Sequence, residues 1–168
     1  MNERKGVITF QGNPLTLIGP ALKAGDNAPD FNISAVDLSP VNLSQSKGKT
    51  RLISVVPSLD TPVCDAQTKR FDQEAEKLPA NVEIFTVSMD LPFAQKRFCS
   101  ANSIRNKVYS DYNNASFGQN WGVLIKELRL LTRAIFVVGA DDKIKYVEIV
   151  PEMTNHPNYD KALAAARG

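Results

Sequence analysis

The chain has 168 residues, of which 43% are hydrophobic and 23% charged, and its 20 basic and 18 acidic side chains leave a net charge of +2. This composition is typical of a globular protein with one hydrophobic core, and so small a net charge argues against binding to nucleic acid or to an acidic membrane surface. Because no run of about 18 apolar residues could span a membrane and the first residues do not resemble a signal peptide, we expect one cytoplasmic domain over residues 1–168.

The N-terminal third of the chain predicts four strands, two of which form a hairpin. Residues 7–17, with a turn signal at residues 12–14, indicate a peripheral β-hairpin. Residues 31–36 alternate between apolar and polar side chains, as in a strand with one buried face. The nearly continuous apolar run over residues 51–56 is typical of a central strand that is covered on both faces.

The next segment predicts a helix with a cysteine in its first turn. Thr61 or Asp60 can act as the N-cap, and Pro62 occupies the first helical position. Side chains at steps of three and four form a core-facing stripe, which consists of Cys64, Thr68, Phe71, Ala75 and Leu78. The side chains expected on the solvent-facing side are Lys69, Arg70, Asp72, Gln73, Glu76 and Lys77.

Strands and helices alternate through the remainder of the chain. Residues 82–88 predict a strand, so that a strand–helix–strand unit surrounds Cys64. A second helix is expected from Phe93 to about Ala101, with Cys99 in its last turn and with Leu91, Ala94, Phe98 and Ala101 on one face. The other expected elements are strands at 107–110, 134–138 and 143–149 and helices at 114–120 and 158–167, whereas residues 124–131 show no clear pattern.

This order of elements predicts an α/β fold in which helices flank both faces of a central mixed β-sheet, with the N-terminal hairpin outside it. A thioredoxin-like fold matches the order. The order alone also fits a flavodoxin-like sheet, so the pattern of strands and helices leaves both open.

Cys64 is the first candidate for chemistry because of its place in the helix. A cysteine reacts as its thiolate, and a free thiol with a pKa of about 8.5 is mostly protonated at neutral pH. The N–H groups of a first helical turn and the positive end of the helix dipole favour an anion there. Pro57 and Pro62 stiffen the approach to the thiol. The same spacing also suits a cysteine that is simply buried in an amphipathic helix.

Several other cysteine chemistries fit the sequence poorly. A dithiol oxidoreductase needs a second thiol three residues after Cys64, where Gln67 stands. Cys64 and Cys99 are 35 positions apart and His156 is the only histidine, which makes a poor zinc site and a poor cysteine–histidine hydrolase. We therefore expect thiol redox chemistry between two separated cysteines, without a metal or cofactor.

Two motifs resemble those of the peroxiredoxin family. Residues 57–64, Pro-Ser-Leu-Asp-Thr-Pro-Val-Cys, resemble the family's active-site signature. Residues 91–99, Leu-Pro-Phe-Ala-Gln-Lys-Arg-Phe-Cys, resemble the second motif of the bacterial thiol peroxidase branch. The hairpin around residues 12–14 is similar to the N-terminal extension of that branch, so the resemblance covers nearly the whole chain. Trp121, where a tyrosine is expected, is a departure outside these motifs.

The resemblance implies a thiol-dependent peroxidase and a role for each of five residues. Cys64 would attack the O–O bond of hydrogen peroxide or an organic hydroperoxide and become a sulfenic acid. Thr61 would hydrogen-bond the thiolate and the peroxide, Pro57 would shield the sulfenic acid from overoxidation, and Arg133 would supply a positive charge beside the sulfur. Cys99 would be the resolving cysteine, closing an intrachain disulfide that a thioredoxin reduces. The resemblance also implies a homodimer.

A disulfide requires Cα atoms within about 7 Å of each other, and Cys64 and Cys99 are expected on different helices. We therefore expect the first turn around Cys64 and the segment around Cys99 to unwind during turnover. Two other hypotheses explain the same residues. One is a peroxide sensor or thiol-switch binding protein that forms the same disulfide, and the other is a thioredoxin-fold module with inert cysteines.

Overall fold

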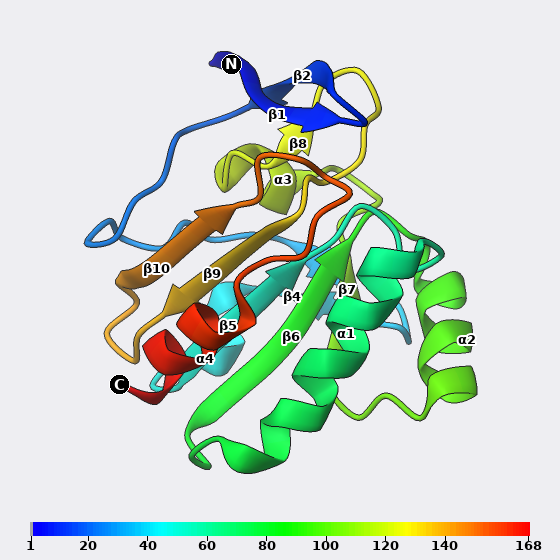
Figure 1. Cartoon of the computed structure of the whole chain (residues 1–168). Helices are drawn as coiled ribbons and strands as arrows, with labels where there is room; N and C mark the ends of the chain where they lie inside the picture. The colour runs from blue at the N-terminus through cyan, green and yellow to red at the C-terminus, as the bar shows by residue number, and fades with distance from the viewer. Residues whose placement is uncertain (1) are drawn as a thin grey trace.

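The computed structural model describes residues 2–168 and arranges them around a seven-stranded mixed sheet (Figure 1). From one edge to the other, its strands are β10 (Ile144–Ile149), β9 (Ala134–Val138), β5 (Thr50–Val55), β6 (Val82–Ser88), β7 (Lys107–Ser110), β3 (Ile33–Ser34) and β4 (Pro40–Val41). Strands β5, β6 and β7 run parallel, whereas the pairs at both edges of the sheet are antiparallel. The predicted mixed sheet is confirmed, and β5, buried along its whole length, lies inside it as expected.

Helices cover both faces of this sheet. Helices α1 (Pro62–Glu74) and α4 (Tyr159–Arg167) pack on one face through apolar side chains that include Phe71 and Leu163, and α2 (Pro92–Asn102) lies beside β7. The short helix α3 (Ser116–Asn120) packs on the opposite face. Two 3-10 turns, Leu43–Ser46 and Ala75–Lys77, complete the described elements. None of the helices within residues 2–168 has the length and apolar composition that a membrane span requires.

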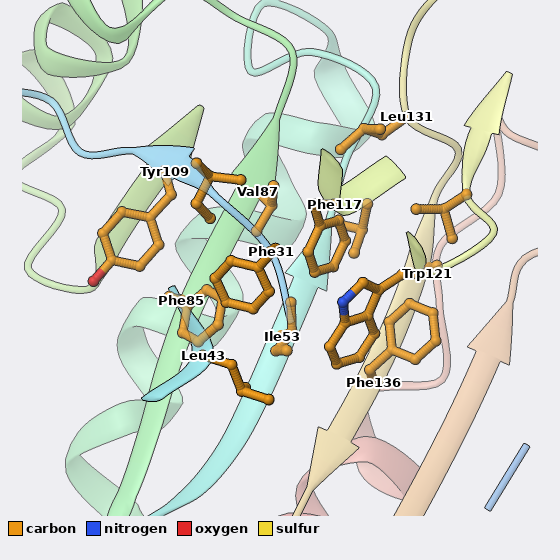
Figure 2. Packing of buried hydrophobic residues seen from close by; sticks show 14 of the residues in the cluster. Phe31, Leu43, Ile53, Phe85, Val87, Tyr109, Phe117, Trp121, Leu131 and Phe136 are labelled. Atoms are coloured by element: carbon orange, nitrogen blue, oxygen red, sulfur yellow. The ribbon is translucent and has the colours of Figure 1, made fainter. Parts of the chain in front are cut away.

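The larger core lies on the α3 face and is rich in aromatic side chains (Figure 2). Trp121 stacks on Phe117 with ring centroids 5.0 Å apart and meets the edge of Phe136 from β9 at the same distance. Phe31 packs against Phe117 at 5.5 Å. Offset and edge-to-face pairs of this kind add to the stability that burial of the rings provides.

The N-terminal hairpin consists of β1 (Glu3–Phe10) and β2 (Asn13–Ile18), as predicted, and forms a separate three-stranded sheet. Its third strand, β8 (Leu124–Ile125), comes from the segment whose sequence shows no clear pattern. Only Ile33–Ser34 of the strand predicted at residues 31–36 forms. The hydroxyl of Ser116 bonds both backbone groups of Asn32, which occupies the groups that a neighbouring strand would need.

Two predicted helix faces need correction. Asp72 of α1 is buried rather than solvent-facing, because its carboxylate accepts the backbone N–H groups of Arg105 and Asn106 at 2.9 and 2.8 Å. In α2 most of the predicted apolar face is wrong. Leu91, Ala94 and Ala101 are exposed, and only Phe98 of that face packs on an apolar cluster. The fully buried side chains of the helix are Pro92 and Gln95. The Gln95 amide donates to the Ser88 hydroxyl and to the Tyr109 carbonyl, so polar contacts help to orient this helix.

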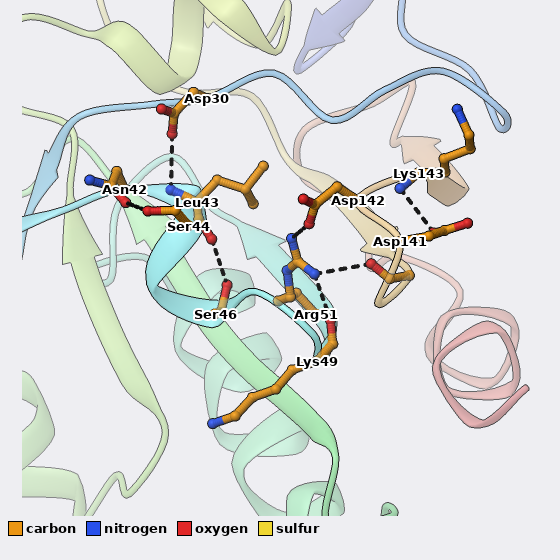
Figure 3. Close-up of polar contacts among 11 residues, drawn as sticks. Asp30, Asn42, Leu43, Ser44, Ser46, Lys49, Arg51, Asp141, Asp142 and Lys143 are labelled. Carbon is orange, nitrogen blue, oxygen red and sulfur yellow. Dashed lines mark hydrogen bonds and ion pairs between the residues drawn. The ribbon is translucent and has the colours of Figure 1, made fainter.

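Arg51, at the start of the apolar run of β5, is completely buried (Figure 3). Its guanidinium donates to the carbonyls of Lys49 and Gly139, the latter at 3.0 Å, and pairs with the carboxylate of Asp142. These contacts fasten the beginning of β5 to the turn between β9 and β10, because a buried charge is tolerated only when it is paired and hydrogen-bonded.

Candidate active site

The segment that connects β5 to α1 places Cys64 at the start of a helix. Pro57 is buried two residues after the end of β5, and Thr61 has the extended backbone of an N-cap, with φ −113° and ψ 149°. Pro62 begins the helix, so Cys64 lies in its first turn, where the backbone N–H groups have no acceptor one turn earlier in the helix. The Cys64 side chain is fully buried. The predicted helix start is therefore confirmed.

A buried arginine contacts the sulfur of Cys64. Arg133, which directly precedes β9, donates from Nη2 to Cys64 Sγ at 3.3 Å. Its Nε donates to the carbonyl of Met153 and its Nη1 to Oε1 of Gln67, both at 3.0 Å. Arg133 is only 2% exposed, so its charge is little screened by water and stabilises an anion on the sulfur.

Gln67 belongs to this arrangement, although the sequence reasoning did not include it. It is fully buried one turn after Cys64, and its amide also donates to the Ser54 hydroxyl of β5 at 2.7 Å. A buried glutamine satisfied at both ends fixes its neighbours in place. One sequence feature could have indicated Gln67: it lies next to Thr68 on the core-facing side of the helix, where an amide side chain is unusual.

A pocket of about 520 Å³ adjoins these groups. Pro57, Thr61 and Arg133 line it, together with the apolar side chains of Phe10, Leu128, Leu130 and Met153. Phe10 belongs to the N-terminal hairpin, so an element far from Cys64 in the sequence forms part of the wall. A mostly apolar pocket with a few convergent polar groups is typical of a small-molecule site.

The Thr61 hydroxyl lies at the exposed rim of this pocket and donates to the carbonyl of Ser58 at 2.9 Å. Since its one proton is engaged there, the oxygen is left to accept a hydrogen bond from a molecule in the pocket. This differs from the predicted contact with the thiolate, because the structure directs the Thr61 proton to the backbone.

Cys99 is half-buried in the last turn of α2, where its carbonyl accepts the N–H of Ile104 at 3.0 Å. Both cysteines are free thiols, and both contact one apolar cluster that contains Val56, Leu59 and Val108. Burial, with a smaller contribution from the charge of Asp72, raises the pKa of the Cys99 thiol. The structure thus brings Pro57, Thr61 and Arg133 together at one pocket. The buried Cys64 sulfur lies behind this pocket in contact with Arg133, and Cys99 packs on the apolar cluster that contains Cys64.

Known proteins resemble this chain over nearly its full length. The Redoxin family model matches residues 23–163. The chain is 58% identical over 161 residues to a thiol peroxidase of Halalkalibacterium halodurans, covering 95% of this chain and 96% of the relative. A Bacillus subtilis thiol peroxidase is 52% identical over 161 residues, with coverage of 95% and 96%.

Solved structures agree with these relatives. A peroxiredoxin-like protein from Aquifex aeolicus superposes with a TM-score of 0.89 at 41% identity, covering 95% of this chain and 94% of that one. A thiol peroxidase from Chromobacterium violaceum, at 19% identity and a TM-score of 0.84 with 92% and 91% coverage, shares the fold.

Proposed function

Because this chain belongs to the Redoxin family, has the thioredoxin-like fold of its peroxiredoxin neighbours and is a thiol-dependent peroxidase, we propose that Cys64 is the thiol that attacks the peroxide. The observation that carries this proposal is the 3.3 Å contact between Arg133 Nη2 and Cys64 Sγ beside a pocket. Cys99 has no comparable cation among the contacts within residues 2–168, and its thiol pKa is raised.

In the first step the Cys64 thiolate attacks one peroxide oxygen. The S–O bond forms as the O–O bond breaks, and the departing alkoxide or hydroxide takes a proton and leaves as alcohol or water. The products are a Cys64 sulfenic acid and ROH. Arg133 and the N–H groups of the first turn of α1 stabilise the negative charge as it moves from sulfur to the leaving oxygen.

Thr61 and Pro57 position the peroxide and limit access. The Thr61 oxygen accepts the O–H of the hydroperoxide, because its own proton is held by the Ser58 carbonyl. Pro57 is buried at the pocket and has no N–H, so it restricts the space around the newly formed sulfenic acid. The apolar walls accommodate the alkyl group of an organic hydroperoxide, and hydrogen peroxide occupies only the end next to Arg133.

In the second step Cys99 resolves the sulfenic acid. Its thiol condenses with Cys64–SOH to give the Cys64–Cys99 disulfide and water, and the dithiol of a thioredoxin then reduces that disulfide and becomes oxidised itself. The raised pKa keeps Cys99 protonated in the folded form. Unwinding around Cys64 and Cys99 exposes Cys99, removes the cause of that shift and favours its thiolate.

A homodimer in the cytoplasm is the proposed working form. Leu91 and Phe93 are 53% and 67% exposed at the start of α2, and Tyr112 is 38% exposed. The Ser110 hydroxyl donates to the carbonyl of Asp90, which brings the Tyr112 segment next to the start of α2. Large apolar side chains grouped on a surface are typical of an interface between protein chains. A reducing compartment would supply thioredoxin and keep both cysteines free.

Intact-mass analysis after one equivalent of hydroperoxide tests this function. We expect the protein to lose two hydrogen atoms, with a peptide that links Cys64 to Cys99. The Cys99→Ser variant should instead gain one oxygen atom, and Cys64→Ser should remain unchanged. With thioredoxin, thioredoxin reductase and NADPH, the parent protein should consume peroxide continuously. A single stoichiometric oxidation without turnover would identify a sensor rather than an enzyme.

A further inference from the structure

Asp90 joins the two segments that carry the cysteines. Its Oδ1 accepts the Ser58 hydroxyl at 2.7 Å, and its Oδ2 accepts the N–H of Leu59 at 2.8 Å and the Ser88 hydroxyl at 2.7 Å. Ser58 and Leu59 belong to the loop that leads into Cys64, whereas Asp90 lies just before α2. A single carboxylate therefore holds the loop before Cys64 against the helix that contains Cys99.

The α2 side of this contact is fixed independently of the loop. The Gln95 amide donates to the Ser88 hydroxyl at 3.0 Å and to the Tyr109 carbonyl at 2.8 Å. The Ser110 hydroxyl donates to the backbone carbonyl of Asp90 itself. Contacts with β6, β7 and α2 thus hold Asp90 in place. Its hydrogen bonds to the loop before Cys64 can break while these contacts remain.

A second carboxylate holds the far end of α2. Asp72 of α1 accepts the N–H groups of Arg105 and Asn106, which follow α2. Asp72 lies two turns beyond Cys64 in the helix, so unwinding of the first turn leaves this contact in place. The contacts of Asp90 with Ser58 and Leu59 precede Cys64 and must break when that turn unwinds.

We propose that Asp90 is a positioning residue that latches the Cys64 loop in its peroxide-reducing geometry and thereby sets how soon the sulfenic acid becomes available to Cys99. This inference rests on the proposed function. While the latch is closed, a second hydroperoxide can convert Cys64–SOH to the sulfinic acid Cys64–SO₂H and ROH. Once it opens, Cys64–SOH and the Cys99 thiol form the disulfide and water. Asp90 therefore controls the ratio of these two products.

The size of the effect follows from the contacts that are lost. One hydrogen bond to a charged group is worth about tenfold in an equilibrium constant. Asp90→Ala removes both contacts with the loop, and we expect the peroxide concentration that gives equal amounts of sulfinic acid and disulfide to rise about tenfold or more. Asp90→Asn keeps one acceptor oxygen and should give a smaller rise.

The experiment mixes each reduced protein with increasing excess of hydroperoxide, quenches the reaction and measures the products by intact mass. Disulfide appears as the loss of two hydrogen atoms and sulfinic acid as the gain of two oxygen atoms. Asp30→Ala is the matched control, because the Asp30 carboxylate also accepts two backbone N–H groups, that of Phe31 and that of Leu43, and the latter bond is drawn in Figure 3. Neither partner belongs to a segment that carries a cysteine. We expect its product ratio to equal that of the parent protein.

A product ratio in the Asp90 variants equal to that of the parent, or shifted towards sulfinic acid, would overturn the latch, provided that the parent forms the disulfide. Failure of the parent to form it would instead contradict the proposed function. If Asp90→Ala does not fold, Asp90→Asn and Ser58→Ala decide the question. Amide exchange at Leu59 gives a second readout, and its protection should fall in the Asp90 variants while both thiols are still reduced.

Discussion

Arg133 reaches the Cys64 sulfur in a fixed direction because two of its other nitrogens are held. Nε bonds the Met153 carbonyl, and Nη1 bonds Gln67, which in turn bonds Ser54 of β5. A guanidinium is planar, so these two contacts determine where Nη2 points. Gln67 therefore acts on the reaction through the orientation of Arg133 rather than by touching the peroxide.

We predict that Gln67→Met slows sulfenic acid formation about tenfold, since a small loss of alignment at the reacting atoms is costly. Stopped-flow measurement of the first oxidation checks this prediction. Gln73→Met, at an exposed position of the same helix, should leave the rate unchanged. Because Gln67 works through Arg133, the double variant Gln67→Met/Arg133→Met should be no slower than Arg133→Met alone. Additive losses in that cycle would contradict the role given to Gln67.

Residues of the site differ in how far the sequence predicts them. Thr61 and Cys64 stand within one short motif, where local helix chemistry explains both. Arg133 is 69 positions from Cys64, and only the family resemblance pointed to it. Asp72 and Asp90 bind backbone N–H groups. Every residue except proline has such a group, so the amino-acid sequence does not identify the partners of these two carboxylates.

At the scale of elements, the N-terminal hairpin is held at the pocket by Glu152. This carboxylate accepts the Thr9 hydroxyl at 2.8 Å and the N–H of Gly12 at 2.9 Å, and the N–H of Met153 donates to the Thr9 carbonyl. Hydrogen bonds from Thr154 and Gly12 lower the pKa of Glu152 to about 2. Glu152 therefore adds to the backbone bonds between Thr9 and residues 151–153 that place Phe10 in the pocket wall.

We predict that Glu152→Ala lowers kcat/KM for a bulky apolar substrate such as cumene hydroperoxide about tenfold, while the value for hydrogen peroxide changes less than twofold. Loss of apolar contact with one large side chain is worth about 1–2 kcal/mol, which gives this ratio. Steady-state kinetics with both peroxides checks the selectivity. Glu3→Gln, which removes a surface pair with Lys126, is the control and should keep the selectivity of the parent.

The selectivity should also be independent of pH between about 5 and 8. The folded pKa of Glu152, about 2, lies below its ordinary value of 4.5, so the stabilisation from this carboxylate is fully present above pH 4.5 and is lost as the pH falls towards 2. A selectivity that changed within the neutral range would show that another group holds the hairpin.

Most elements formed where local patterns predicted them, with exceptions at residues 31–36 and 124–131, whereas the buried face of α2 differed from its hydropathy pattern. The order of strands and helices came from periodicity and turn residues, which are local properties. The buried face of α2 is set by Gln95 and its bonds to Ser88 and Tyr109, and hydropathy assigns an amide to the solvent side. The wall that the hairpin provides was also beyond prediction, because it depends on how distant loops meet at Glu152.

For the whole molecule, the segment that follows β2 and the end of α3 meet where their backbones are in contact. Gly122 has φ +70°, and a Cβ there would lie 1.9 Å from the Pro20 carbonyl oxygen. Gly19 has φ +109°, and its Cβ would lie 2.2 Å from the Gln119 carbonyl oxygen. Arg4 of β1 bonds both glycine carbonyls. Contact this close makes the hairpin sheet an integral part of the fold.

We therefore predict that residues 1–168 unfold as a single domain and that Gly122→Ala lowers the stability of all of it. The positive φ and the close approach together should cost more than about 1 kcal/mol. Thermal unfolding followed by far-UV circular dichroism reports on the whole chain, and fluorescence of the buried Trp121 reports on the junction. Both signals should show one transition at the same, lower midpoint.

The control Gly48→Ala separates the effect of positive φ from the effect of close approach. Gly48 has φ +84° but nothing within 4 Å of its Cβ position, so this substitution should lower the midpoint less. If Gly122→Ala gave an early fluorescence change followed by a separate transition in circular dichroism, the hairpin sheet would be an independent unit, and its role as a wall of the active site would have to rest on the Glu152 contacts alone.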